Sequence, residues 1–217
     1  MTLPHESVFS QLRSDFIVGW KNIKKEPWRG QSHGYTKRQT CVGTTNGAGA
    51  HNVQIFILAP DTTVLHALPG FWHPEDLARE LRFAKVLWRL WGDDTRTLAQ
   101  KRRMFRSLQL AEAAYDPAET VVRSGWQGFD ASIERARAGQ HPRDTFLVDS
   151  AGKPVPGLGG APRMKPLNVL VHDRMAQRPF VKFRDFDVEA FVDYGLSFYD
   201  NNLGVDRRHK RFPNPRR

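Results

Sequence analysis

The sequence predicts a protein of the α/β class, and three observations support this fold class. Residues 52–68 hold two short runs rich in β-branched and aromatic residues on either side of a turn, which is typical of a β-hairpin. Residues 74–91 repeat apolar residues at helical spacing. Segments after residue 93 also have helical periodicity. We therefore expect a unit over residues 1–92 that contains the sheet, followed by a mainly helical extension over residues 93–217 with a basic C-terminal tail.

Before the hairpin, the sequence predicts a helix, a strand and a long connection. Residues 5–13 carry an apolar stripe at helical spacing, and the apolar run over residues 15–23 is typical of a buried strand. Residues 26–51 are rich in Gly, Thr, Ser and Asn, with a short helix indicated around residues 34–41. A connection of this length is uncommon in a compact domain, and such connections are often functional.

The hairpin and the helix after it are the clearest elements. The turn over residues 60–63 separates strands predicted over residues 52–59 and 64–68. Pro74 suits the first turn of a helix, and Gly92 suits its C-terminal end. The predicted core stripe of this helix consists of Leu77, Leu81, Ala84, Trp88 and Trp91.

The second half of the chain has weaker patterns. Helical spacing recurs over residues 95–114, 129–138 and 187–194. Residues 145–149 are typical of a strand that enters a turn, and residues 165–176 mix apolar and polar positions without a clear period. These patterns predict a helical extension with one short strand.

The segment FILAPDTTVLHALPGFWHPEDLARELRFA resembles the hairpin and closing helix of the thioredoxin superfamily, where a short turn leads through "VL" and a glycine to "PEDL". The resemblance implies that residues 1–92 form a thioredoxin-like unit. In that family a strand, a helix and a second strand come before the hairpin. A CxxC pair at the start of the first helix carries out thiol-disulfide exchange there.

This chain departs from the family at the residues that perform the chemistry. It begins part-way into the family's first helix, so the CxxC pair and the strand before it are missing. The family's cis-proline position matches Val53, which follows His51 and Asn52. A cis bond before a residue other than proline costs about 3 kcal/mol, so we expect a trans bond here. The resemblance thus implies an incomplete or degenerate thioredoxin-like sheet.

The missing strand raises a structural question, because it lies centrally in the family's sheet. It would stand between the strands that match residues 15–23 and 52–59, and both would lose backbone partners without it. Two explanations are open. Residues 145–149 fill the gap, or the protein begins upstream of Met1. We favour an upstream start, which would also account for missing active-site cysteines and a missing signal peptide.

Cys41 is the only cysteine, so this chain cannot form an intramolecular disulfide, a CxxC pair or a multi-cysteine zinc site. One hypothesis makes Cys41 a single reactive, catalytic thiol with His51 or His33 nearby as its base or as a co-ligand. The alternative, which we favour, is a small buried residue, because nothing in the sequence places a histidine beside the sulfur.

Other motif-like segments lack the context that their chemistry needs. Residues 47–52 have a strand after them, whereas a phosphate-binding loop needs a strand before it and a helix after it. Residues 172–174 (HDR) have no nucleophile signature beside them, so they do not predict a hydrolase triad. We expect no metal site and no cofactor, because no metal-ligand spacing joins His33, His51, His66, His73 and Cys41.

A net charge of +10 and a pI near 10.1 indicate affinity for polyanions. Positive charge is concentrated over residues 101–106 and in the C-terminal tail. No zinc-finger, RRM, KH or recognition-helix pattern accompanies it. The tail therefore predicts non-specific polyanion contact, through Arg207, Arg208, Lys210 and Arg211.

The predicted function is a redox-inactive interaction module with a protein partner, or a truncated thiol-disulfide oxidoreductase. The alternative is a basic nucleic-acid-associated protein that binds through residues 101–106 and the tail. The sequence has no apolar run of membrane-spanning length and no signal peptide at Met1. These absences predict a cytoplasmic protein that binds no membrane, or an extracytoplasmic one if an N-terminal segment is missing.

Overall fold

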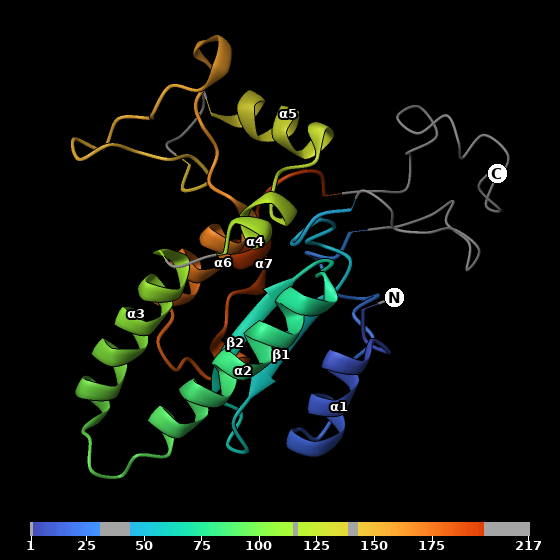
Figure 1. The fold of residues 1–217 in the computed structure, drawn as a ribbon, viewed down its shortest axis with the longest axis vertical. Helices are drawn as coiled ribbons and strands as arrows, with labels where there is room; N and C mark the ends of the chain where they lie inside the picture. Colours follow the sequence, from blue (N-terminus) through green and yellow to red (C-terminus); the bar gives the residue numbers. More distant parts are fainter. Residues whose placement is uncertain (1, 31–43, 115–116, 139–142, 198–217) are drawn as a thin grey trace, which may run out of the picture.

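The computed structural model describes residues 2–30, 44–114, 117–138 and 143–197. Within these ranges the chain forms seven α-helices and one small antiparallel sheet of two strands (Figure 1). The predicted α/β class is therefore confirmed at this level. The short helix predicted around residues 34–41 lies outside the described residues.

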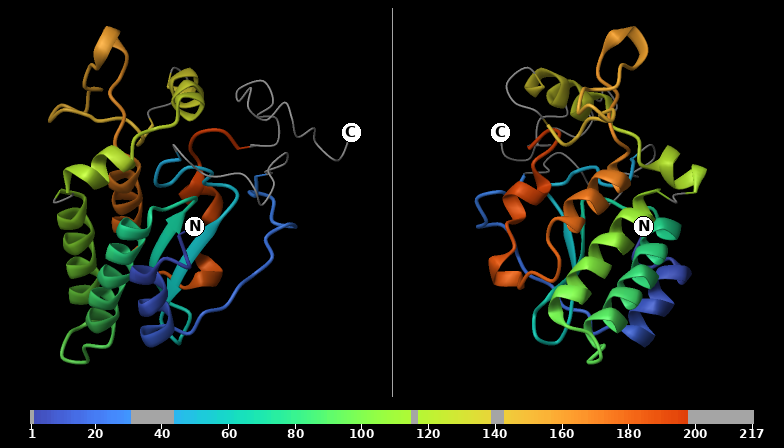
Figure 2. Two further views of the ribbon diagram at one scale, coloured as in Figure 1. Left: turned by 45° about the vertical axis from the view of Figure 1, so that its right-hand side comes forward. Right: turned by 90° about the vertical axis from the view of Figure 1, so that its left-hand side faces the viewer.

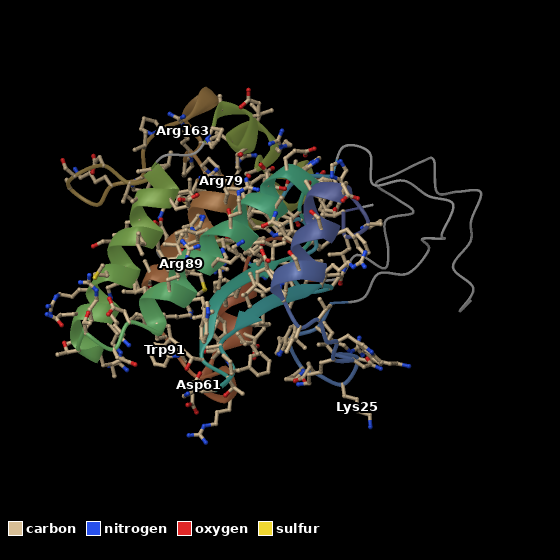
Figure 3. All side chains as sticks on the ribbon, turned by 60° about the horizontal axis from the view of Figure 1, so that its bottom comes forward. Lys25, Asp61, Arg79, Arg89, Trp91 and Arg163 are labelled. Atoms are coloured by element: carbon tan, nitrogen blue, oxygen red, sulfur yellow. The ribbon has the colours of Figure 1, made fainter. Side chains whose placement is uncertain are left out.

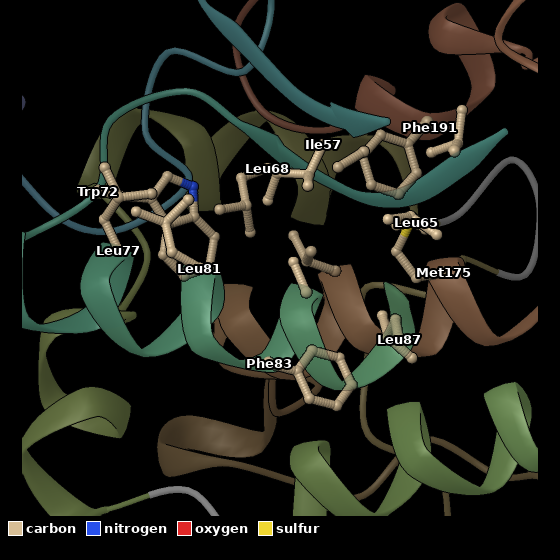
Figure 4. Packing of buried hydrophobic residues seen from close by; sticks show 14 of the residues in the cluster. Ile57, Leu65, Leu68, Trp72, Leu77, Leu81, Phe83, Leu87, Met175 and Phe191 are labelled. Atoms are coloured by element: carbon tan, nitrogen blue, oxygen red, sulfur yellow. The ribbon is translucent and has the colours of Figure 1, made fainter. Parts of the chain in front are cut away.

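The sheet is the predicted hairpin, formed by β1 (Gln54–Leu58) and β2 (Val64–Pro69). The strands pair with Phe56 opposite Ala67, and a register shift follows Ile57. All six residues of β2 are buried, because helices pack against it and the C-terminal part of the chain covers it. Figure 4 shows β2 side chains and α2 side chains pointing toward one another in the core.

Helix α2 (Pro74–Trp91) follows the hairpin as predicted, with Pro74 in its first turn. Gly92 ends it, and its backbone N–H donates to the carbonyl oxygen of Trp88 at 3.0 Å. The predicted core stripe is wrong at one position. Trp88 is 43% exposed, whereas the neighbouring Leu87 is fully buried. The helix turns its Leu77, Leu81, Ala84 and Leu87 side to the core, so Trp88 lies on the outer side.

Helices on both sides of α2 complete one layer. Helix α1 (Glu6–Asp15) packs along α2, and α3 (Leu98–Ala114) packs against α2 and, more extensively, against α6 (Leu167–Ala176). The helices predicted over residues 5–13 and 95–114 are therefore confirmed. Residues 165–176, which have no clear period, form α6 because that helix is buried nearly all round.

The rest of the described chain adds shorter helices. The predicted helices over residues 129–138 and 187–194 are present as α5 (Gly128–Arg137) and α7 (Val188–Val192). No periodic pattern in the sequence indicates α4 (Ala118–Arg123). Two 3-10 turns also occur, at Leu158–Gly160 and Phe183–Asp185.

The C-terminal part of the described chain lies against the hairpin. The Val64 N–H donates to the carbonyl oxygen of Val181 at 2.8 Å. The Phe56 ring meets the rings of Phe183 and Phe186 edge-on, at centroid distances of 4.9 and 5.3 Å. One core cluster therefore joins residues from Val8 to Tyr194. The division of the chain at residue 92 stays a prediction.

Two predicted strands are absent from the described residues. Residues 16–23 form no strand, because no neighbouring segment within the described ranges pairs with them. Residues 145–149 form isolated bridges, between Phe146 and Met164 and between Val148 and Pro154, and they do not lie beside β1. The proposed filling of the central gap by residues 145–149 is therefore wrong. No helix of the described chain has the length and hydropathy to cross a bilayer.

Candidate functional site

The first candidate site is an exposed segment after α1. Residues 16–30 run from the end of α1 to the turn before β1 (Figure 2), where the Gly30 N–H donates to the His51 carbonyl oxygen at 2.7 Å. Three large apolar side chains of this segment face solvent, with exposed fractions of 104%, 67% and 90% for Ile17, Val18 and Trp20. We call these three residues the exposed apolar strip.

A second feature that suits a binding partner is the outer edge of β1. Within the described residues β1 pairs with β2 alone. The Gly70 N–H donates to the Val53 carbonyl oxygen at 2.7 Å, so odd-numbered residues of β1 bond to β2. Gln54 and Phe56 therefore direct their N–H and C=O groups away from β2. Such an edge is a template for another strand.

The second candidate site is a buried polar cluster inside the helical layer. It consists of His66 on β2, Glu80 on α2, Gln109 on α3 and His172 on α6. All four side chains are buried. His66 lies on a strand with no exposed face, and Glu80 lies on the side of α2 that carries Leu77 and Leu81. The four elements bring these residues together across the core.

The Glu80 carboxylate lies near the Nε2 atoms of both imidazole rings in the cluster. His66 Nε2 donates to Glu80 Oε2 at 2.9 Å, and His172 Nε2 lies 3.4 Å from Glu80 Oε1. His172 Nδ1 donates to Gln109 Oε1 at 2.6 Å. The two rings stack with centroids 5.4 Å apart, and Phe83 meets both rings edge-on. Each ring is therefore held in one orientation.

Burial and the neighbouring charges set the ionisation of the cluster. Burial lowers the pKa of His66, although its hydrogen bond to Glu80 opposes this change, so the ring is neutral near pH 7. Burial acts to raise the pKa of Glu80, but His172 and His66 outweigh burial and hold this pKa well below its ordinary value. Glu80 is therefore a buried carboxylate. One ligand atom from each of the residues His66, Glu80 and His172 lies within 4.8 Å of the others, a spacing that suits a cation.

Of the predicted catalytic residues, the structure describes His51, which does not belong to this cluster. Cys41 and His33 lie outside the described residues. His51 is buried, and its Nδ1 lies 2.9 Å from the carbonyl oxygen of Trp28. His73 Nε2 lies 3.0 Å from the Thr44 carbonyl oxygen. Of the histidines in this set that the structure describes, which are His51, His66 and His73, His66 joins the cluster. The pairing of Cys41 with a histidine stays a prediction.

The other predicted site residues lie at the surface or outside the described chain. Val53, at the position of the family's cis-proline, is exposed, and the described residues contain no cis peptide bond. The four basic residues of the tail are outside the described chain: Arg207, Arg208, Lys210 and Arg211. Polyanion contact through the tail therefore stays a prediction.

Three members of the cluster were missed by sequence reasoning: Glu80, Gln109 and His172. A weak signal exists, since each stands where its helix requires an apolar residue. Glu80 is adjacent to Leu81 of the core stripe, and His172 ends the run LNVLVH. A polar residue at such a position predicts a buried polar side chain, but the sequence does not indicate which buried side chains contact one another.

The comparisons with known proteins found no match: no family model matches the sequence, and no curated protein or solved structure is significantly similar to it. Function is therefore inferred from the residues themselves.

Proposed function

We propose that the protein is a non-enzymatic, thioredoxin-like interaction module that binds an extended segment of a partner protein along the outer edge of β1. The observation that carries this proposal is the outer edge of β1, which pairs with no strand among the described residues, in a chain that also exposes the apolar strip. An added strand would satisfy the outward N–H and C=O groups of Gln54 and Phe56. The strip would supply contacts for the strand's side chains.

The thioredoxin-like part of the proposal is supported by the order of elements. An antiparallel hairpin is followed at once by α2, which packs on β2. In the thioredoxin family the strand beside the equivalent of β1 is the central strand of the sheet. The partner's segment would therefore occupy the position of that central strand, which is not found among the described residues.

The charge around the strip indicates the chemistry of the partner. Lys24 and Lys25 are exposed, and Lys25 extends into solvent in Figure 3. Lys21 is paired with Glu26 at 2.6 Å, so it is partly neutralised. We therefore propose a segment with apolar residues at alternate positions and acidic residues at its end.

The cysteine content supports a role without redox turnover. Catalytic disulfide exchange needs an attacking thiolate and a resolving thiol. This chain has one cysteine, Cys41. In an insulin-reduction assay the chain should therefore show no turnover above the rate with reductant alone. Measurable turnover that a Cys41→Ser variant abolishes would contradict the proposal.

Peptide selection tests the binding surface directly. A random-peptide phage library would be selected on the full chain, and enriched peptides would be measured against the wild type and a Val18→Ser, Trp20→Ser variant. We expect apolar peptides with acidic ends, and a loss of affinity of at least about tenfold in the variant. A Trp88→Ser variant, altered at an exposed tryptophan on α2, is the matched control and should bind normally.

Hydrogen exchange identifies the edge that is used. A bound strand should slow amide exchange at Gln54 and Phe56, whose N–H groups point outward, more than at Ile55. The proposal fails if no peptide is enriched, or if the peptides bind the strip variant as well as the wild type.

A second candidate function, nucleic-acid association, is favoured by one observation. Arg102, Arg103 and Arg106 are exposed on α3, and within the described residues they form no ion pair. Lys101 does not contribute to this surface. It is buried, and its Nζ donates to the Trp91 carbonyl oxygen at 2.5 Å.

A further inference from the structure

We infer that the buried polar cluster binds one divalent transition-metal ion of the zinc class, with His66, Glu80 and His172 as its ligands. Zinc binds imidazole nitrogens and carboxylate oxygens at about 2.0–2.2 Å, so two ligands of a tetrahedral site lie about 3.3–3.5 Å apart. The two separations from Glu80 are 2.9 Å to His66 and 3.4 Å to His172. All three ligand atoms lie within 4.8 Å of one another. Small side-chain shifts would bring them around one ion.

The donor set favours zinc over calcium or magnesium. Two of the three donors are imidazole nitrogens, which suit zinc, copper, iron and nickel. Calcium and magnesium prefer oxygen ligands throughout. Glu80 supplies the single negative charge. Two histidines and one glutamate, with water in the fourth position, are a known donor set of catalytic zinc sites.

Gln109 gives an independent reason to place a cation in the cluster. Its Oε1 accepts a hydrogen bond from His172 Nδ1 at 2.6 Å. That bond leaves His172 Nε2 directed toward Glu80 Oε1, which lies 3.4 Å away. A histidine ligand commonly donates its other ring N–H to such a partner, so Gln109 holds the His172 ring in the orientation that a metal ligand needs.

His66 must change its hydrogen bonding when the ion binds. It now donates its Nε2 proton to Glu80. To use Nε2 as a ligand, the neutral ring must move this proton to Nδ1, which has no hydrogen-bond partner in the part of the chain that the structure describes. Binding therefore requires the other neutral tautomer of His66 and releases no proton from this ring.

The position of the cluster points to a structural ion. The three ligands come from β2, α2 and α6, so an ion would link the hairpin to both of these helices. His66 and His172 are 0% exposed and Glu80 is 1% exposed, so bulk water does not reach the ligands. Catalytic zinc sites keep one position open for water or substrate. This burial favours a role in stability over one in catalysis.

Metal content and thermal stability test the inference on the full chain, produced without a histidine tag. Protein stripped with a chelator would be given Zn²⁺, dialysed and analysed by inductively coupled plasma mass spectrometry. We expect about one equivalent of zinc per chain and a higher unfolding midpoint than in the stripped protein. The variants Glu80→Gln and His172→Gln should lose both the zinc and the rise in midpoint.

A matched control separates the cluster from the other histidines. His73→Gln changes a partly buried histidine that bonds to a carbonyl oxygen, and it should keep the full zinc content. Gln109→Leu removes the partner of His172 and leaves all three ligands. It should weaken zinc affinity by about 10- to 100-fold without abolishing binding. Circular dichroism would confirm that each variant is folded.

The wild-type protein decides the question if the cluster variants do not fold. Co²⁺ would replace zinc, and the intense visible absorption of a low-coordinate cobalt site with nitrogen and oxygen ligands is the expected result. The inference is overturned if reconstituted wild type holds far less than one equivalent of zinc with no change in midpoint. It is also overturned if folded His172→Gln keeps the metal, or if cobalt gives only the weak spectrum of the hydrated ion.

Discussion

Arg123 donates two hydrogen bonds to the carboxylate of Asp76, at 2.7 Å from Nε to Oδ2 and at 2.8 Å from Nη2 to Oδ1. Asn46 Nδ2 and Thr120 Oγ1 donate to the same carboxylate, each at 2.7 Å. Asp76 lies in the first turn of α2, and Arg123 ends α4. One nearly buried carboxylate therefore joins two helices to the turn before the hairpin.

We expect Asp76→Asn to lower the free energy of unfolding by about 2–3 kcal/mol, since it removes a charged acceptor of several hydrogen bonds. The half-exposed pair of Asp61 and Lys182, at 2.8 Å, offers a control. Asp61→Asn should cost less than about 1 kcal/mol. Urea unfolding measures both, and equal losses would contradict this role for Asp76.

The same carboxylate makes stability depend on pH. Burial acts to raise the pKa of Asp76, but hydrogen bonds from Arg123, Asn46 and Thr120 outweigh it and hold this pKa below its ordinary value. Asp76 therefore stabilises the fold above about pH 4, and this contribution is lost as the pH falls through its folded pKa. The stability difference between wild type and Asp76→Asn should stay constant above about pH 5 and narrow as the pH falls below about 4. A difference that does not narrow at low pH would contradict the assignment.

Neighbouring residues of α2 offer a matched test of the core. Leu87 is fully buried, and Trp88 is 43% exposed. Leu87→Ala should lower the free energy of unfolding by about 2–4 kcal/mol, because it leaves a cavity. Trp88→Ala should cost less than about 1 kcal/mol. Denaturant unfolding measures the free energy of unfolding of both variants. A larger loss for Trp88→Ala than for Leu87→Ala would contradict the outer position of Trp88.

Gly70 is required where the end of the hairpin meets the turn before it. Its φ of +71° favours glycine, and a Cβ there would clash with the Ala48 carbonyl oxygen and lie 2.7 Å from that of Gly47. Gly70→Ala should therefore cost about 3 kcal/mol or more. Gly152 has a φ of +75°, and no atom lies within 4 Å of the place that an added methyl group would take. Gly152→Ala should therefore cost only about 1 kcal/mol. Thermal unfolding measures the loss of stability in the two variants. Equal losses would mean that the backbone at Ala48 and Gly47 moves aside at little cost, which would contradict the prediction.

Nucleic-acid association predicts a defined salt dependence. If Arg102, Arg103 and Arg106 each contact a phosphate, their replacement by alanine should lower the slope of log K against log salt by about 2–3 for duplex DNA. Replacing the three lysines of residues 21–25 removes the same charge elsewhere and should change the slope little. Deletion of residues 206–217 tests the tail. A slope that vanishes with the tail alone would exclude a role for α3.

The hairpin and α2 could be predicted because their signals are local. The Pro-Asp turn, the β-branched run and the Pro74 start all act within a few residues. Burial of Leu87 in place of Trp88 could not be predicted as readily, because both fit a helical stripe and the packing of α1 and α3 decides which side is covered. Residues 16–23 have strand composition, but a strand also needs a neighbour to pair with.

The buried polar cluster was beyond sequence reasoning for a related reason. The local sequence around Glu80, His172 or His66 does not distinguish these residues from other polar residues in helices and strands. They come together only when β2, α2 and α6 pack, and local periodicity does not predict that packing. Spacing rules find metal ligands on one helix or loop, and these ligands lie on three separate elements.

Tyr194 donates a buried hydrogen bond to the carbonyl oxygen of Gly47 at 2.6 Å, across 147 residues of chain. This hydrogen bond and the one between Val64 and Val181 hold residues 181–194 against the hairpin and the turn before it. Contacts of such long sequence separation slow folding. During synthesis the inner face of the hairpin therefore stays open until residue 194 has left the ribosome. The nascent chain is exposed to aggregation over that interval, so slow growth at low temperature or extra chaperone should raise the yield of native protein.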